Sequence, residues 1–415
     1  MKAAPRGTSS RALPAALSLC AVALAVALTD GCSAGQPPPV ARPRVTSTVL
    51  SWGSFFGGRP GNFGIRTSPV AVRLPGKVAE VGTSNAAQYA LLIDGSLYAW
   101  GLGSQGELGD GSTASSFTTP VRVRFPPGVK IASIPTDAMP YDTGLAVDTR
   151  GHVWGWGRNG GGELCLGTKA EYLVPVELPF AGVTALAGAS HHALYDAGGT
   201  IWACGQNVAG DLGDGSRAST TVPVRVAGLG GQPVARLVAS FANSGALLTS
   251  GQYYDWGYNG QGQLGDGHIG HSSDVPVPVY LPAPVTQVAQ GGSLWGNGQT
   301  LAMLADGSLW AWGSNYAGQL GNGQRQLQPA PVPIQPPAGI TYHALATGSA
   351  TSYAISTTGK VYAWGTGHLG QVGDGLTRTA ITPVLVAAAA TAISSTANNA
   401  VVNVLPSARP AGPNT

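Results

Sequence analysis

The side chains that could do chemistry in this chain of 415 residues are few and do not form a recognisable catalytic centre. The sequence contains no His-Glu-x-x-His zinc motif, no Gly-x-Ser-x-Gly nucleophile elbow and no Walker loop for phosphate. No acidic pair recurs at one position of the repeats described below, as the carboxylates of a channel-lining acid–base site would. We therefore expect a protein that is not an enzyme and that uses no cofactor.

Three glycine-rich segments match the Gly-x-Gly-x-x-Gly pattern of a dinucleotide-binding loop: Gly101 to Gly106, Gly260 to Gly265 and Gly365 to Gly370. A dinucleotide loop needs a helix N-terminus after it, because that terminus directs backbone N–H groups at the pyrophosphate. These glycines lie between predicted β-hairpins. We interpret them as tight turns.

Metal binding has one candidate, formed by His268, His271 and Asp274. No fourth ligand accompanies these three residues, so a solvated loop is the favoured interpretation. Asp-Gly pairs could also suggest calcium, but the other acidic ligands of a calcium loop are missing and a turn role is favoured. These pairs begin at Asp110, Asp214, Asp266 and Asp374. We expect no metal.

A short alternating run that ends in Trp-Gly or Cys-Gly occurs seven times, at intervals of 48 to 56 residues. The residues before the glycines are Trp52, Trp100, Trp156, Cys204, Trp256, Trp312 and Trp364. A Gly-x-Leu-Gly-Asp-Gly phrase follows most of these runs, and a Pro-Val step follows all seven. The alternation indicates half-buried strands, and a fixed period in this range indicates a propeller, solenoid or array.

The cleanest copy runs from Asp306 to Gly321 and reads Asp-Gly-Ser-Leu-Trp-Ala-Trp-Gly-Ser-Asn-Tyr-Ala-Gly-Gln-Leu-Gly. This register resembles the repeat of the regulator of chromosome condensation family, and the resemblance extends over roughly Val45 to Leu405. It implies an all-β fold, a seven-bladed β-propeller. The usual Gly-x-x-His of the family is kept only at Gly188 to His191.

The two ends of the chain predict how the ring closes. The first repeat begins at Thr48 to Trp52 and lacks the two strands that precede Trp-Gly elsewhere. The missing strands follow the last Pro-Val step, at Ala392-Ile393 and at Ala400 to Val404. We expect the N- and C-terminal strands to share one blade, because this pairing removes the exposed edges of an open array.

An export leader precedes the repeats. Residues 1–32 form a predicted signal peptide, with a basic start and an apolar stretch from Leu13 to Leu28. Cys32 resembles a bacterial lipoprotein acylation site, although ordinary cleavage after Ala34 is equally compatible. A Pro-rich linker at 33–44, the propeller at 45–405 and a disordered tail at 406–415 complete the prediction. We expect a bacterial exported protein, lipid-anchored at the cell surface or secreted.

The charge balance argues against nucleic acid as a partner. The chain has 22 Lys/Arg and 19 Asp/Glu, and removal of the leader leaves 19 basic and 18 acidic side chains, a net charge of +1. Nucleic-acid binding needs a basic footprint, and no local Lys/Arg run supplies one. We expect no nucleic acid, and membrane contact only through a lipid anchor.

Cys165 and Cys204 are the two cysteines expected inside the propeller. Cys165 stands where the other repeats have Gly, and Cys204 stands where they have Trp. Because these departures coincide in consecutive repeats, they predict a disulfide, which an exported protein could form. The bond requires Cα atoms within about 7 Å of each other.

Loops on one face of the propeller are expected to carry the binding surface, since members of the family often bind partners there. Aromatic anchors among small polar residues are typical of protein interfaces. For any single candidate, an isolated surface residue or a blade-packing residue is the alternative interpretation. The candidates are Phe55, Phe56, Met139, Tyr141, Phe241, Tyr258, Trp295, Tyr316 and His368.

We expect an extracytoplasmic protein-binding β-propeller scaffold, monomeric, with an unidentified protein partner. One alternative is guanine-nucleotide exchange on a Ran-like GTPase together with chromatin binding, which the family implies and which the leader and the near-neutral charge oppose. The other is a cell-surface lyase or glycosidase, which would need a carboxylate-lined channel.

Overall fold

The structure, a computed structural model, describes residues 48–54, 65–135, 139, 142–189, 191–229, 231–292, 297–396 and 398–404. These belong to the unit Val45–Thr415, which is distinct from the unit Met1–Arg44. The predicted leader, Cys32, the Pro-rich linker and the tail at 406–415 lie outside the described residues. In the part of the chain that is described, no helix is long and apolar enough to span a membrane.

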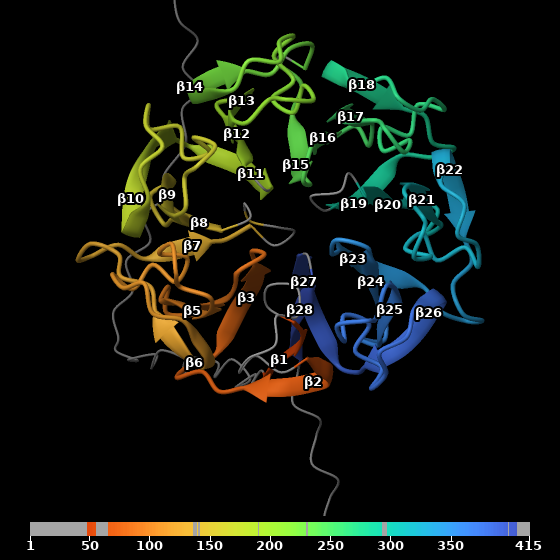
Figure 1. The fold of residues 1–415 in the computed structure, drawn as a ribbon, viewed down its shortest axis with the longest axis horizontal. Helices are drawn as coiled ribbons and strands as arrows, with labels where there is room; N and C mark the ends of the chain where they lie inside the picture. Colours follow the sequence, from red (N-terminus) through yellow and green to blue (C-terminus); the bar gives the residue numbers. More distant parts are fainter. Residues whose placement is uncertain are drawn as a thin grey trace, which may run out of the picture. The chain divides into compact units, whose positions relative to one another are not determined.

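The described residues form seven antiparallel sheets of four strands, arranged as blades around a central axis (Figure 1). The fold is the predicted all-β, seven-bladed β-propeller. Blade 1 contains β1, β2, β27 and β28, and blades 2 to 7 each contain four consecutive strands from β3 onward. We call the interface between two neighbouring blades a seam.

Each blade uses its strands in the same order from the axis outward. The innermost strands are β3 (Val78–Thr83), β7 (Ile131–Ser133), β11 (Val183–Ala189), β15 (Val234–Ala239), β19 (Val285–Gly291), β23 (Tyr342–Thr347) and β27 (Ala390–Thr396). The second strands are β4 (Ala87–Leu92), β8 (Thr143–Asp148), β12 (His192–Ala197), β16 (Asn243–Leu248), β20 (Gln299–Leu304), β24 (Thr351–Ser356) and β28 (Asn399–Val404).

The third strands end in the Trp-Gly or Cys-Gly pair, and the outer strands contain the Pro-Val step. The third strands are β1 (Thr48–Gly53), β5 (Leu97–Gly101), β9 (His152–Gly157), β13 (Thr200–Gly205), β17 (Tyr253–Gly257), β21 (Leu309–Gly313) and β25 (Val361–Gly365). The outer strands are β2 (Arg66–Val72), β6 (Ser116–Arg122), β10 (Tyr172–Ala181), β14 (Thr220–Arg225), β18 (Ser273–Val279), β22 (Gln328–Ile334) and β26 (Ala380–Ala387).

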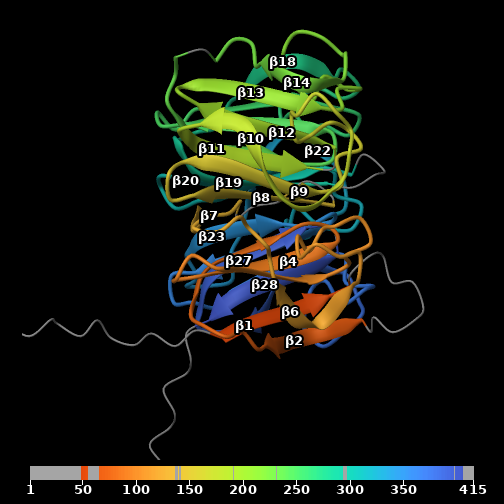
Figure 2. The ribbon, with the colours of Figure 1, turned by 90° about the vertical axis from the view of Figure 1, so that its left-hand side faces the viewer.

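Blade 1 closes the ring with strands from both ends of the sequence. β1 pairs antiparallel with β28 in a register that runs from Thr48 opposite Val404 to Gly53 opposite Asn399. β27, which contains Ile393, lies one strand further in and pairs with β28. Figure 2 shows β1 and β28 side by side, and the predicted shared blade is confirmed.

The apolar core is divided among the seams rather than gathered at the centre. Seven clusters of buried side chains each combine residues of two neighbouring blades. At the seam between blades 5 and 6, for example, Tyr253 of one blade packs with Trp312 of the next, and both are fully buried. Burial of these faces therefore holds one blade to the next.

A hydrogen bond recurs at five seams. At each of these seams, the indole Nε1–H of the tryptophan donates to a backbone carbonyl oxygen in the preceding blade. The acceptor is the Gln, Glu or Asp of the Gly-x-Leu-Gly phrase, which has Val372 in place of Leu in blade 7. The donor–acceptor distance is 2.9 or 3.0 Å in each pair: Trp52 to Gln371, Trp156 to Glu107, Trp256 to Asp211, Trp312 to Gln263 and Trp364 to Gln319. Each indole is thus buried and paired at the same time.

The glycine two residues after each of these acceptors lies directly against the indole. A Cβ at Gly265 would lie 2.7 Å from Nε1 of Trp312, closer than packed atoms can approach. This residue also has a φ of +66°, a conformation that favours glycine. The indole can therefore pack in this position only because the residue facing it in the preceding blade is glycine.

The seam between blades 1 and 2 uses a different partner. The indole of Trp100 donates to Oε1 of Gln88 within its own blade (2.8 Å). The same oxygen accepts the hydroxyl hydrogen of Ser51 in blade 1 (2.7 Å), and Nε2 of Gln88 donates to the Asn399 side chain (3.1 Å). Gln88 therefore joins the two blades where the first repeat lacks the Gly-x-Leu-Gly phrase.

Deletion of residues 390–415 should destabilise the protein, because it removes β27 and β28 and leaves β1 with an unpaired edge. We expect aggregation on size-exclusion chromatography with light scattering, and a lower melting temperature. Deletion of 406–415 alone is the control, since it keeps both strands. A monomeric 390–415 deletion that melts like the intact protein would contradict the closure.

Candidate functional site

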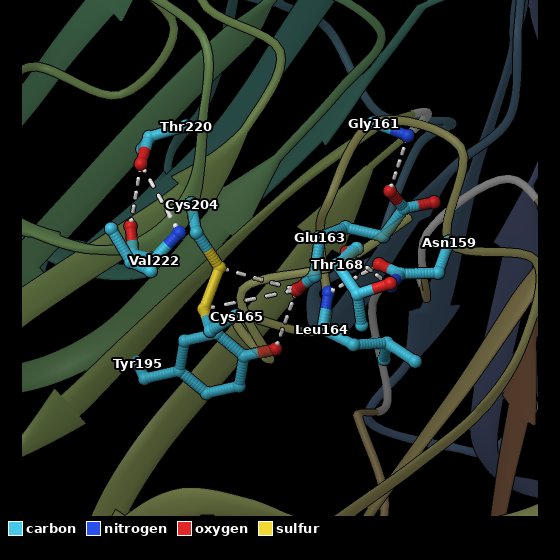
Figure 3. The surroundings of a disulfide bond; sticks show 10 residues. All are labelled: Asn159, Gly161, Glu163, Leu164, Cys165, Thr168, Tyr195, Cys204, Thr220 and Val222. Carbon is cyan, nitrogen blue, oxygen red and sulfur yellow. Dashed lines mark hydrogen bonds between the residues drawn. A yellow bond between two sulfur atoms is a disulfide. The ribbon is translucent and has the colours of Figure 1, made fainter. Parts of the chain in front are cut away.

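Cys165 and Cys204 are bonded at the seam between blades 3 and 4 (Figure 3). Their Cα atoms are 5.6 Å apart, within the limit of about 7 Å for a disulfide. The sequence alone could not establish this distance. Both side chains are buried, at 3% and 0% exposure. The structure therefore places a covalent link at the one of the seven seams whose Trp-Gly pair is replaced by Cys-Gly.

The two replacements explain each other. Cys165 occupies the position of Gly265 and has a φ of +59°, which is uncommon for a residue with a side chain. Its Cβ would collide with an indole at position 204, but Cys204 is small and leaves room for it. Tyr195 donates its hydroxyl hydrogen to the Glu163 carbonyl (3.0 Å), the oxygen that an indole would reach in the other seams.

Because consecutive strands are antiparallel, the loops after the innermost and third strands open at one end of the blades. We call this end the Trp-Gly face. Phe241, Tyr258, Tyr316 and His368 are on its loops: Tyr316 is 51% exposed, His368 is exposed, and Phe241 and Tyr258 are half-buried. Phe55, Phe56, Tyr141 and Trp295, also predicted contact residues, lie outside the described residues.

Met139 is a correction to the predicted contact set. Its side chain is 1% exposed and belongs to the apolar cluster between blades 2 and 3. The Met139 N–H donates to the Thr83 carbonyl oxygen of blade 2 (2.9 Å), which holds this residue against the seam. Met139 is therefore a core residue and is not accessible to a partner.

Five loop residues of the Trp-Gly face lie together at blades 5 and 6. Phe241, Tyr258 and Asn297 line a shallow depression of about 10 Å³. Asn297 donates from Nδ2 to the hydroxyl oxygen of Tyr316 (3.3 Å), and Gln261 donates from Nε2 to Oδ1 of Asn297 (3.4 Å). We call Phe241, Tyr258, Gln261, Asn297 and Tyr316 the aromatic patch. The loop segments that form it, 240–243, 258–264, 297–299 and 314–320, contain no charged residue.

The loops are anchored by asparagines that the sequence analysis missed. Asn259 is fully buried, and its Oδ1 accepts the N–H of Leu264 (3.1 Å) while its Nδ2 donates to Asp266 and to the His268 carbonyl. Asn315 holds the next blade's loop in the same way, through the N–H of Leu320 (3.0 Å). The recurrence of Asn two residues after Trp-Gly is the sequence signal that could have identified them.

A single carboxylate recurs at one position in each of blades 2 to 4. Glu107, Glu163 and Asp211 occupy the position that is Gln in blades 5 to 7. Each accepts a backbone N–H from two residues earlier, at 2.7, 2.8 and 3.3 Å respectively. They therefore serve as buried loop caps, as the Gln side chains do.

Burial disfavours the charged form of these acids. Burial raises the pKa of Asp211 to about 7, against the opposing hydrogen bond from the Ala209 N–H. The pKa of Asp142, which lies near Glu107, is also raised to about 7, by burial and then by the negative charge of Glu107, although Arg158 lies 3.4 Å away. The Trp-Gly face therefore has acids buried in the loops of blades 2 to 4, whereas the aromatic patch at blades 5 and 6 consists of uncharged residues.

Asp211→Asn should change the dependence of stability on pH. The pKa of Asp211 is higher in the folded protein than its value of 3.8 in the unfolded chain, so protonation of Asp211 stabilises the folded state. This stabilisation is fully present below pH 3.8 and is lost as the pH rises through about 7. The melting temperature of the variant, relative to the wild type, should therefore increase by on the order of 2 °C between pH 5 and pH 8.

Asp306→Asn is the matched control for that measurement. Hydrogen bonds from Ser308 lower the pKa of the exposed Asp306, so its charge does not change between pH 5 and pH 8. Parallel pH curves for Asp211→Asn and Asp306→Asn would contradict the assignment of a buried, neutral Asp211.

Comparison with known proteins shows the family. The model of the regulator of chromosome condensation (RCC1) repeat matches residues 94–135, 150–195, 198–242, 250–299 and 306–355. These segments make up more than half of the chain. The chain therefore belongs to the regulator of chromosome condensation repeat family.

Two relatives from Arabidopsis thaliana are similar over most of their length. The ultraviolet-B receptor UVR8 is 30% identical over 340 residues, which cover 79% of this chain and 74% of UVR8. The mitochondrial RCC1 domain-containing protein RUG3 is 29% identical over 384 residues, 84% of each chain.

Solved structures share the fold. Human WBSCR16 superposes with a TM-score of 0.75 at 18% identity, over 88% of this chain and 100% of the other. Prp20p of Saccharomyces cerevisiae superposes with a TM-score of 0.74 at 21% identity, over 88% of this chain and 93% of the other. At this identity the likeness concerns the architecture alone.

Proposed function

We propose that this chain is an extracytoplasmic protein-binding β-propeller without catalytic activity of its own, which contacts its partner through the aromatic patch on the Trp-Gly face. The observation that carries the proposal is the patch itself. It joins the exposed Tyr316 to the amide side chains of Asn297 and Gln261 across two blades, with Tyr258 beside Asn297 in the depression and without a charged residue.

The composition of the patch suits a protein interface. Tyrosine offers a large contact area and a polar end, and such residues are enriched among those that dominate binding energy. The absence of charge avoids the cost of desolvating ions when a partner covers the surface. Hydrogen bonds between Gln261, Asn297 and Tyr316 order these side chains before binding, which lowers the entropic cost.

Relatives support a binding role. UVR8 is a receptor, and the yeast protein Prp20p has been characterised for its binding to Gsp1p and histones. We carry over only the general property, a propeller that binds protein partners, because the loops that contact a partner differ freely on a shared fold.

The predicted export favours this binding function over nucleotide exchange on a cytosolic GTPase. The predicted leader would remove the chain from the cytoplasm, and the net charge of +1 without the leader offers little attraction for nucleic acid. Detection of the mature chain in the cytoplasm, with acceleration of nucleotide release from a Ran-like GTPase, would favour the exchange alternative instead.

The double variant Tyr258→Ala/Tyr316→Ala should lose partner binding by about 2 kcal/mol per residue if both are hot spots. Its melting temperature should change little, because Tyr316 is half exposed and Tyr258 is only partly buried. The partner is first captured from envelope and culture proteins with the mature domain, and affinity for the purified partner is then measured by calorimetry.

Tyr280→Ala is the matched control. Tyr280 is 80% exposed and follows the outer strand β18, so it lies on the opposite face. Wild-type affinity in the double variant, or an equal loss in Tyr280→Ala, would move the binding surface away from the aromatic patch.

Cys32→Ala tests the proposed lipid anchor. If Cys32 is acylated, the variant should move from the membrane fraction to the soluble fraction, because the attached lipid is then the only anchor. Cell fractionation with immunoblotting makes the comparison, and Cys20→Ala in the same leader is the control. A wild-type protein that is already soluble would instead support simple secretion.

A further inference from the structure

The seam between blades 3 and 4 differs from its neighbours in what closes it. Five seams are closed by an indole that is already present in the newly made chain. This one is closed by Cys165 and Cys204, and the bond between them exists only after oxidation. Without this bond, the seam keeps the backbone hydrogen bond from the Gly167 N–H to the Thr221 carbonyl oxygen (2.8 Å), the hydrogen bond from Tyr195 to Glu163, and the stacked rings of Phe180 and Tyr195.

Reduction would leave this seam short of contacts that the others have. Cys204 fills much less space than an indole, and two unbonded sulfur atoms must move apart inside a buried site. Cys165 would still hold its φ of +59° without the covalent bond that compensates for it. The Glu163 carbonyl would keep the Tyr195 hydroxyl but would gain only a weak thiol donor in place of an indole N–H.

We propose that oxidation of Cys165 and Cys204 is a latch that locks the propeller between blades 3 and 4, so that the ring is fully stable only in an oxidising compartment. The latch is a property of the folded domain and does not depend on which partner is bound. The latch is consistent with the proposed export, because the ring would be completed only after the chain has left the cytoplasm.

The chemistry of the latch requires a disulfide oxidant, such as oxidised glutathione. One thiolate attacks the oxidant and forms a mixed disulfide, and the second thiolate then displaces glutathione. Overall, the two thiols lose two protons and two electrons, and the oxidant is reduced to two thiols. Both sulfur atoms are buried in the finished ring, so the bond forms while the seam is still open and is protected once the seam has closed.

The test compares the wild type with two variants, each refolded from denaturant with glutathione redox buffer or with a phosphine reductant. Cys165→Gly/Cys204→Trp restores the Gly and Trp of the other repeats and should lock the seam without a bond. Cys165→Ala/Cys204→Ala has neither lock. Intact mass with alkylation gives the redox state, and hydrogen exchange followed by mass spectrometry reports on the seam.

In reduced wild-type protein, we expect exchange to be at least several-fold faster in peptides covering 159–168 and 200–207 than in oxidised protein, with a lower melting temperature. Peptides covering 259–268 and 309–315, at the seam between blades 5 and 6, should not change. The Ala/Ala variant should behave like reduced wild type under both conditions, and the Gly/Trp variant should be insensitive to the redox buffer.

Equal exchange and equal melting of reduced and oxidised wild type would overturn the proposal, as would two free thiols in protein refolded with glutathione. Should the Gly/Trp variant not fold, the wild-type and Ala/Ala comparison still decides. These measurements use purified protein, so they test the latch independently of export. The latch can be contradicted while the Cys32→Ala fractionation supports export, and export can be contradicted while these measurements support the latch.

Discussion

The propeller depends on one interaction that passes from blade to blade: a buried indole N–H donates to a backbone carbonyl of the preceding blade. It links local sequence to the closed ring, because the donor ends one blade's third strand and the acceptor lies in the loop of its neighbour. A buried indole N–H without an acceptor would cost about 1 to 3 kcal/mol, so these five seams are held by the need to pair that N–H as well as by apolar burial. The seams that lack this bond have a substitute, Gln88 in one case and the Cys165–Cys204 bond in the other.

Much of the fold could be predicted from the sequence because every blade has to pack against the next one, and similar residues do this in repeat after repeat. The phase of Trp-Gly and Pro-Val shows the number of blades, and the unequal ends show that β1 and β28 must pair. The role of Met139 could not be predicted, since a backbone hydrogen bond to Thr83 holds this residue at the seam, and a backbone bond leaves no signal in the sequence. The carboxylates Glu107, Glu163 and Asp211 were missed for a related reason: they replace Gln as caps of backbone N–H groups, so their role depends on loop geometry.

This division of roles explains why the fold is better defined by the sequence than the site is. Residues that close a seam are constrained by partners in two blades, as Gly265 and Trp312 are. Residues of the aromatic patch contact one another mainly at their polar ends, and Tyr316 could change without disturbing a seam. The scaffold therefore fixes the positions of the loops on the Trp-Gly face while leaving their exposed side chains free to vary, and the aromatic patch is the part of that face we assign to a partner.

Hydrogen exchange in Trp312→Phe and Trp310→Phe tests the central claim most directly. The two tryptophans are on the same strand, β21, but the indole of Trp312 donates across the seam to Gln263, whereas that of Trp310 donates to Ser308 in its own hairpin. We predict that Trp312→Phe accelerates exchange in blade 5, in peptides covering 259–267, as well as in blade 6, and that Trp310→Phe, which keeps the hydrogen bond to Gln263, leaves these blade 5 peptides unchanged. Acceleration confined to blade 6 in both variants would contradict the account.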